Sequence, residues 1–440
     1  MSMNIAWKGE SDRRTARSGL PLRTLSMIGA VLLILPAAAA GNRPLRIKVF
    51  GSGDVGAVNV MARWFTAEPS TDPLLIPTRE WGDVTPEVIN RLMRLYFPRR
   101  EEDLLTYDFF LFALIDADHF TGQQQMWIRN ALDNHLKGGI NGRSTQGKYD
   151  TEWRDSILDE PFPNDVEAVL SDMHYQHGKT GPMVIVDSGD VPGIMKPFKE
   201  RVEPLFRAYT DAQPILITIP KPGSVILSYT RNNAGIGYPI PGQLAHVFYW
   251  HWNHSTTFTF RDMITSPFWD EGGSPPNVYA PDIMVNIIWF CTAHELPDDP
   301  YMVHQFRMDL YNFGLRKSLL ASLLEFAEKF GAIPSKEYDE LNRVEGIRGE
   351  ASAQYLGSQY DAAYETLNRA LQELDGLEDD AMRLKDKTLF WVYVVEWATV
   401  TATMLLAGVT IWALMLKRSM YREVASTRSS PMLLVLQCMP

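Results

Sequence analysis

The sequence predicts an α/β domain, then a helical stalk, and then one transmembrane helix. Three observations support this architecture. Short apolar runs alternate with helical patterns up to about residue 295, long helical patterns follow from residue 315, and an almost uncharged apolar segment lies close to the carboxyl terminus. Strands that alternate with helices are typical of α/β folds, and long apolar segments are typical of membrane spans.

The apolar segment Leu389–Leu416 carries a single charge, Glu396, and its last 19 residues, 398–416, carry none. A helix needs roughly 20 apolar residues to cross a hydrocarbon core of about 30 Å. Trp391 and Trp397 lie where an aromatic belt is expected. The alternative is a buried core helix, but soluble helices rarely continue so long without charge. We therefore predict a membrane anchor.

The amino terminus has the parts of a secretory signal peptide. Five basic residues precede the apolar run Leu25–Leu35, and the small residues Ala37–Ala40 follow it. This order predicts cleavage near Ala39 or Ala40, because the run is short for a membrane span. A retained helix is the alternative.

Charge predicts the orientation. The whole chain has a net charge of −11, and residues 1–40 and 417–440 each carry +3, so residues 41–416 carry −17. Positive flanks stay in the cytoplasm, which predicts a single-pass cell-membrane protein with its acidic body outside and a short cytoplasmic tail. Such an acidic body excludes nucleic acid as a partner, because nucleic acid requires basic faces.

Cys291 and Cys438 fall on opposite sides of the predicted membrane, so no disulfide joins them within one chain. The exported part must therefore fold on its own hydrophobic core. The predicted division is a signal peptide at 1–40, an exported α/β domain at 41–312, a stalk at 313–388, the transmembrane helix at 389–416 and a tail at 417–440.

The exported part begins with a predicted strand, Leu45–Gly51. Gly51, Gly53 and Gly56 have the spacing of a dinucleotide-binding fingerprint, but prolines soon break off the helix that follows. A tight strand-to-helix turn is the favoured role of these glycines. The other predicted elements are helices at 58–65, 84–96, 123–136 and 281–290, and strands at 74–77, 182–187, 215–219, 225–229 and 244–250, with a polar excursion at 138–166.

Phe109–Ile115 is apolar on both faces, as a central parallel strand should be. Asp116, Asp118 and His119 follow it. Ligands bind at the carboxyl ends of strands in open α/β sheets, which makes these residues a candidate ligand site. They could hold a divalent metal, but a polar turn is the favoured interpretation, so no metal or other cofactor is predicted.

The aromatic segment 249–254 is a second candidate ligand site. Trp252 could stack on a sugar while Asn253 and His254 bind its hydroxyl groups. In an extended strand Trp252 and His254 share one face, and Asn253 lies on the other. Packing of these aromatic residues in the core is an equally good interpretation.

The order of elements resembles that of a known superfamily. Tyr107-Asp108 opens a strand that ends in acids, a helix closing on Gly138-Gly139 follows, and a late strand carries Val247-Phe248-Tyr249 and then Asn253-His254. This layout resembles the class I glutamine amidotransferase-like superfamily, and within it the trehalose-utilisation (ThuA-like) proteins and their membrane-anchored relatives, whose late strand ends in V-F-Y-x-x-x-G-H. Here asparagine replaces the glycine. The resemblance covers about residues 44–295 and implies a flavodoxin-like three-layer domain.

The resemblance does not bring a glutaminase nucleophile. A glutaminase needs a cysteine on a strand-to-helix elbow with a histidine beside it. Cys291 is instead expected near the end of an apolar helix, as a buried inert thiol. Ser188 follows a strand, but the glycines of a G-x-S-x-G elbow do not surround it.

From Leu315 the sequence predicts stalk helices at 315–330, 335–350 and 355–374, arranged as a hairpin or small bundle that could contact a protein partner. The favoured function is that of a non-catalytic module that binds either a ligand or a protein partner. A carbohydrate is one candidate ligand. The alternative is a carbohydrate-processing or other hydrolase that uses Asp116, Asp118 and His254. That alternative requires the three side chains to converge on one cleft.

Overall fold

The computed structural model describes residues 46–78, 85–113, 115, 117–135, 137–142, 153, 155–165, 180–205, 219–232, 240–261, 264, 268–269 and 276–428. The predicted signal peptide, Asp116, Cys438 and most of the predicted strand 215–219 lie outside these residues.

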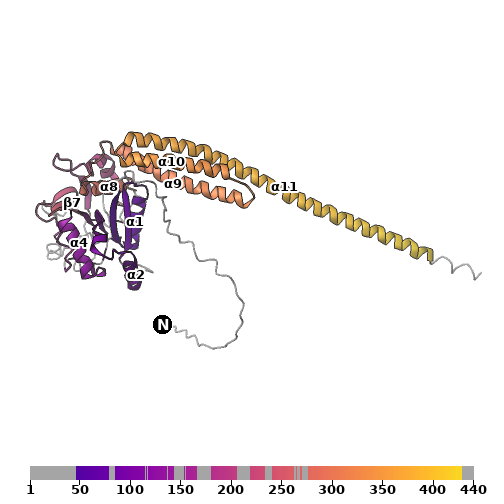
Figure 1. Cartoon of the computed structure of the whole chain (residues 1–440), viewed down its shortest axis with the longest axis horizontal. Helices are drawn as coiled ribbons and strands as arrows, with labels where there is room; N and C mark the ends of the chain where they lie inside the picture. The colour runs from indigo at the N-terminus through magenta and orange to yellow at the C-terminus, as the bar shows by residue number, and fades with distance from the viewer. Residues whose placement is uncertain are drawn as a thin grey trace, which may run out of the picture. The chain divides into compact units, whose positions relative to one another are not determined.

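One eight-stranded mixed sheet forms the centre of the α/β domain (Figure 1), in the order β2-β1-β3-β4-β8-β7-β6-β5. The first five strands in this order are parallel, and β7, β6 and β5 extend the sheet in antiparallel fashion. The strands are β1 Ile47–Gly53, β2 Thr71–Pro77, β3 Phe109–Ala113, β4 Gly138–Gly142, β5 Thr180–Ile185, β6 Val225–Asn232, β7 Gln243–Trp252 and β8 Ser255–Phe260.

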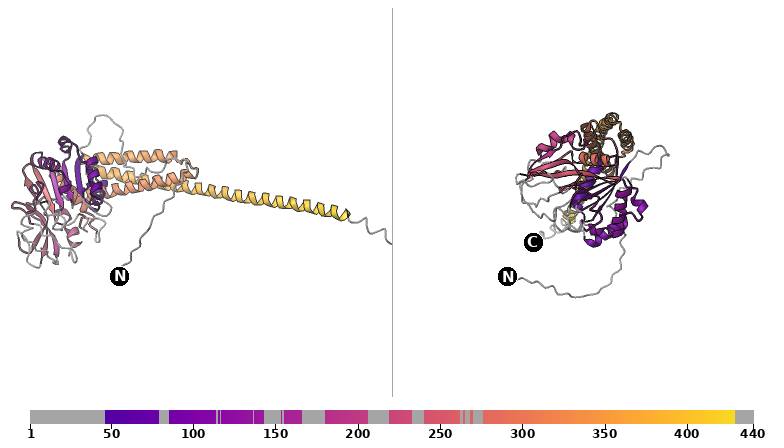
Figure 2. Two further views of the ribbon diagram at one scale, coloured as in Figure 1. Left: turned by 90° about the horizontal axis from the view of Figure 1, so that it is seen from below. Right: turned by 90° about the vertical axis from the view of Figure 1, so that its left-hand side faces the viewer.

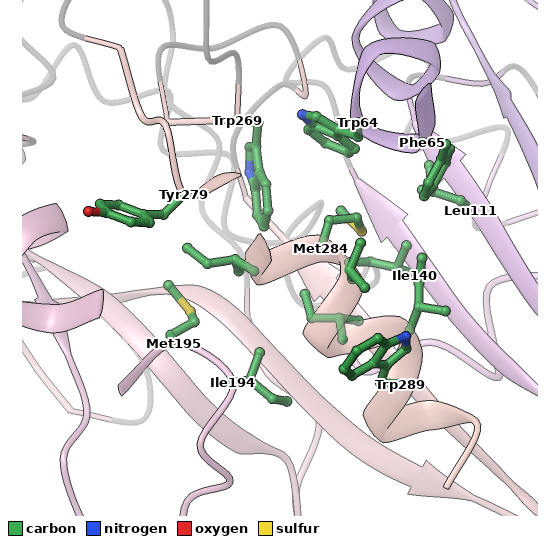
Figure 3. Packing of buried hydrophobic residues seen from close by; sticks show 14 of the residues in the cluster. Trp64, Phe65, Leu111, Ile140, Ile194, Met195, Trp269, Tyr279, Met284 and Trp289 are labelled. Carbon is green, nitrogen blue, oxygen red and sulfur yellow. The ribbon is translucent and has the colours of Figure 1, made fainter. Parts of the chain in front are cut away.

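Helices cover both faces of the parallel strands. On one face Leu111 of β3 packs with α1 (Val55–Thr66) and α8 (Ala280–Cys291), as Figure 3 shows for Trp64, Met284 and Trp289. On the other face Phe112 packs with α2 and α4. Successive strand residues point to opposite faces, so the fully apolar run of β3 supplies both cores. The predicted mixture of sheet and helices is confirmed. The remaining helices of the domain are α2 Pro86–Tyr96, α3 Glu101–Leu104, α4 Gly122–Asn134 and α7 Lys199–Val202.

Two sequence expectations about glycines are wrong. Gly51 and Gly53 lie inside β1 and not in the turn after it, where Asp54 caps α1 by accepting from the N–H of Ala57. Gly138 does not close a helix but begins β4. Crowding explains the glycines, because a Cβ at Gly53 would lie 2.4 Å from the carbonyl oxygen of Ala113.

The crowding at Gly138 gives a stability prediction. A Cβ there would lie 2.3 Å from the Cβ of Cys291 on α8. Gly138→Ala is therefore expected to lower the free energy of unfolding by about 1–3 kcal/mol, measured by urea unfolding in detergent solution. Gly314→Ala is the control, because a Cβ at this helical glycine meets open space. The control should gain roughly 0.5–1 kcal/mol. Equal effects of the two substitutions would contradict the crowding at β4.

Three long helices follow the α/β domain: α9 Pro300–Lys329, α10 Ser335–Leu356 and α11 Tyr360–Arg428. They lie side by side (Figure 2) around an apolar cluster of their own, and the predicted helix at 355–374 is divided between α10 and α11. We call this bundle, up to Thr388, the stalk. Its core residues are Phe313, Leu320, Leu324, Leu341, Val344, Ala370, Leu374, Leu377 and Ala381.

The apolar segment 389–416 continues α11 without a break (Figure 1) and is the one candidate membrane span found in the described residues. None of its most apolar window is buried inside the molecule. Trp397 and Leu406, for example, are 71% and 69% exposed. A core helix would be covered by the rest of the chain, so this exposure fits a membrane-spanning helix.

Candidate functional site

The predicted site after β3 begins a short 3-10 helix, Ala117–His119. Asp118 is exposed and His119 is half-buried, whereas Asp116 lies outside the described residues. Gln125 on α4 holds this turn by donating to the carbonyl oxygens of Ala117 and Phe120 at 2.9 and 3.1 Å. Within the described part of the chain no three His, Cys, Asp or Glu side chains are grouped to hold a metal ion.

Asn253 and His254 form the two-residue turn between β7 and β8, and both are exposed. Asn253 has a φ of +48°, a left-handed conformation that asparagine tolerates better than most residues. Residues just after this turn pair with the first residues of β4, so the turn lies at the amino edge of the parallel strands. Asp118 follows the carboxyl end of β3. Asp118 and His254 are therefore separated by about the length of a strand, roughly 16 Å for five residues.

Trp252 belongs to a closed stack of aromatic and cationic side chains. Its ring stacks on Trp250 at 5.3 Å, and the Arg129 guanidinium lies 5.0 Å from its centre. Its Nε1 donates to Oδ1 of Asp133 at 2.5 Å, and Lys221 lies over the ring of Trp250. Trp250 and Arg129 already contact the half-buried ring of Trp252, which leaves less of that ring to stack on a sugar. Trp252 is half-buried and Asn253 and His254 are exposed, so the last three residues of this segment do not pack in the core.

Cys291 ends α8 and lies against the backbone of β8, where its Sγ is 3.4 Å from the carbonyl oxygen of Thr256. Burial raises the pKa of this thiol well above its usual value, an effect that a backbone hydrogen bond only partly offsets. The thiol therefore stays protonated, and a protonated thiol is a poor nucleophile.

The most unusual chemistry of the described residues lies where the stalk joins the α/β domain. Arg307 on α9 donates to Glu68 and to Asp282 on α8, both at 2.6 Å. Tyr355, at the end of α10, donates to the same Glu68 oxygen at 3.0 Å. His304 adds a contact of 2.7 Å to the other oxygen of Asp282. We call Glu68, Asp282, Arg307 and Tyr355 the junction network.

The junction network is dry. The side chains of Arg307, Glu68 and Asp282 are 6%, 1% and 2% exposed. Burial by itself lowers the pKa of Arg307, but the charges of Glu68 and Asp282 outweigh it and raise the pKa. Burial also raises the pKa of Tyr355 well above its usual value, so the phenol keeps its proton and its role as a donor. The network therefore places one buried guanidinium between two buried carboxylates, and each carboxylate is paired with that arginine.

A cavity of about 260 Å³ lies beside the network. Ile47 and Ser70, at the starts of β1 and β2, and Trp289 of α8 supply one wall. Tyr355 and Tyr360 add lining residues from the stalk. Trp289 donates its Nε1 proton to Ser70 at 2.9 Å, and its ring is nearly parallel to that of Tyr360. The remaining lining residues are His294, Glu295, Leu356 and Ser358.

The cavity lies at the amino edge of the parallel strands, whereas sequence reasoning placed the candidate site at the carboxyl edge. One signal in the sequence points to the junction. Arg307 follows Val303 and Phe306 on the apolar face of α9, and an arginine in an apolar stripe needs buried acidic partners. The pattern does not say which of the many acidic residues those partners are.

No family model matches this chain, and no curated protein matches it either. Two solved structures of cytoplasmic proteins from Salmonella typhimurium show a weak likeness. The first, from strain LT2, is 14% identical with a TM-score of 0.35, and the second is 11% identical with a TM-score of 0.37. Each likeness covers 56% of this chain and 98% of the other chain. Likeness at this level assigns neither fold family nor function.

Proposed function

We propose that the protein is a membrane-anchored binding protein that holds a non-catalytic α/β domain outside the cytoplasm. The observation that carries this proposal is the cavity at the junction. Residues of the α/β domain and residues of the stalk form its walls together, so a bound ligand would contact both parts at once. The dry junction network beside the cavity holds the stalk against the α/β domain and so fixes the positions of the cavity walls.

We further propose that the domain belongs to the glutamine amidotransferase-like group in its ThuA-like, non-glutaminase form. The parallel strands β2-β1-β3-β4-β8 follow the order 2-1-3-4-5 of flavodoxin-like sheets, which supports this assignment. The raised pKa of the Cys291 thiol argues against glutaminase chemistry. Because Asp118 and His254 lie at opposite edges of the sheet, the arrangement does not favour a hydrolase that combines them.

The orientation follows from charge. The basic residues that flank the apolar segments at both ends of the chain favour a cytoplasmic tail at 417–440 and an exported body. The cell membrane is then the location of the protein, and a cleaved signal peptide is its route. A protein partner could also bind the exposed surface of the stalk.

The cavity predicts which compounds bind. Its aromatic walls favour a flat or aliphatic ligand of small size, and Glu295 at its rim favours a cationic group. The full chain in detergent would be screened by thermal unfolding against small amines, quaternary ammonium compounds and sugars. We expect an amine or quaternary ammonium compound to raise the melting temperature, because a ligand at about 100 times its dissociation constant stabilises by roughly 2.7 kcal/mol.

Leu356→Trp provides the test of location, because the larger ring would fill the cavity and abolish the shift. Leu319→Trp is the matched control, since Leu319 is a stalk residue with 71% exposure and does not line the cavity. The proposal fails if no compound of the panel raises the melting temperature, or if the shift persists in Leu356→Trp.

A further inference from the structure

The turn between α9 and α10 exposes apolar side chains. Phe326, Phe330 and Ile333 are 40%, 43% and 85% exposed, and the two phenylalanine rings lie 4.8 Å apart. We call residues 326–334 the stalk tip. Water-exposed apolar groups gathered at one end of a bundle indicate a contact with something apolar.

Ion pairs fix the height of the stalk tip along α11. Arg316 of α9 contacts Asp375 and Glu378 of α11, and both helices run away from the α/β domain. Residues of α9 are therefore level with residues about 59 to 62 positions later in the chain, since both helices rise by the same amount per residue. By this offset Phe330 is level with residues 389–392, the first turn of the predicted span. Figures 1 and 2 show the turn after α9 beside the middle of α11.

The register of α10 agrees with this height. Arg343 pairs with Glu373 of α11 at 3.0 Å, and α10 runs antiparallel to α11. Ser335, eight residues before Arg343, is then level with about residue 381, two turns before the span begins. The loop from Phe330 to Ser335 thus lies within one or two helical turns of the expected membrane surface.

The chemistry of the stalk tip suits that position. Lys329 lies between the two phenylalanines and Lys336 follows Ile333; both are exposed, at 69% and 73%, and each pairs with a glutamate one turn away on its own helix. Phe390 and Trp391, at the same level on α11, are 62% and 57% exposed. Aromatic and aliphatic side chains with lysines beside them are typical of segments that lie at the membrane interface.

We propose that the stalk tip inserts into the headgroup region of the bilayer beside α11. This inference rests on the proposed membrane anchoring of residues 389–416. Two adjacent contacts with the lipid, the span and the tip, fix the tilt of the stalk against the membrane, which a single helix alone does not do. Insertion of the stalk tip should require no anionic lipid, because the surface that contacts the bilayer is apolar.

Depth-dependent fluorescence quenching tests the proposal on the full chain in phosphatidylcholine vesicles. Cys438 is changed to serine, and this parent chain is treated with the same fluorophore to check that the half-buried Cys291, whose thiol has a raised pKa, stays unlabelled. A polarity-sensitive fluorophore is attached through Ile333→Cys, Leu319→Cys or Met404→Cys. We expect spin-labelled lipid to lower the emission at position 333 about twofold or more, as for groups at the interface. Emission at position 319, about 17 Å from Phe330 along α9, should hardly change.

The label at position 404, inside the span, separates the two ideas. Strong quenching at 404 without quenching at 333 overturns the tip contact and leaves the anchor intact, whereas no quenching at 404 overturns the anchor itself. Phe326→Asp with Phe330→Asp in the chain labelled at 333 should abolish the quenching there. Persistent quenching in that variant means that the fluorophore inserts into the lipid by itself, without the stalk tip. A label at 333 that is shielded from iodide but not quenched by lipid indicates a second copy of the chain, and that result also overturns the proposal.

Discussion

Replacing Arg307 by methionine is expected to lower the free energy of unfolding by about 3–5 kcal/mol, the usual effect of removing one partner from a buried ion pair. Methionine keeps much of the side-chain volume but leaves Glu68 and Asp282 charged, at 1% and 2% exposure. Tyr355 and the backbone N–H of Ser70 still donate to Glu68, but these neutral donors do not replace the positive charge. Urea unfolding of the full chain in detergent, followed by circular dichroism, measures the loss.

Two further variants show that charge, and not lost packing, is responsible. Arg316→Met removes an arginine that also bonds two acidic residues but is 30% exposed, so it should cost about 1 kcal/mol or less. Combining Arg307→Met with Glu68→Gln and Asp282→Asn should recover most of the loss, because no buried charge is then left alone. A triple variant no more stable than Arg307→Met would contradict this account.

The junction network explains why a substitution at Arg307 should also weaken ligand binding in the cavity. Arg307 lies 5.4 Å from the ring centre of Trp289, and Tyr355 belongs both to the network and to the cavity wall. Losing the arginine removes the charge that fixes both rings. Ligand binding and stability should therefore fall together in Arg307→Met, whereas Arg316→Met should leave binding unchanged.

Most elements of the α/β domain can be predicted from local patterns. Three apolar runs indicate their own secondary structure without information from the rest of the chain. They are Phe109–Ala113, Gln243–Trp252 and Ala280–Cys291. The strand β4 cannot be found in this way, because three of its five residues are glycines. Glycine is depleted in strands generally, and here it is required by the Cys291 side chain and the Phe260 ring of neighbouring elements.

Sites are harder to predict than strands because their residues come from distant parts of the chain. Arg307 and Glu68 are 239 residues apart, and nothing local to either residue identifies the other. Asp118 and His254 both adjoin strands, but a hairpin reverses the chain between β7 and β8, which places His254 at the opposite edge of the sheet. Strand direction, which the sequence did not reveal, decides which side chains can meet.

Two arginines in the span, Leu405→Arg with Val409→Arg, are expected to move the protein from the membrane fraction to the supernatant after alkaline carbonate extraction. The two positions are 66% and 61% exposed and lie one helical turn apart on α11. Each arginine near the centre of a span costs roughly 2.5–3.5 kcal/mol, so the pair opposes insertion by about 5–7 kcal/mol. Fractionation followed by immunoblotting measures the change.

The matched control places the same charges in the stalk, as Leu315→Arg with Leu319→Arg. These leucines are also exposed, at 49% and 71%, and also lie one turn apart, but α9 carries them above the span. This variant should stay in the membrane fraction. Intact mass must show that both variants begin near residue 41, because a retained helix at Leu25–Leu35 would itself hold the chain in the membrane. If the span variant begins there and still resists extraction, residues 389–416 are not the anchor.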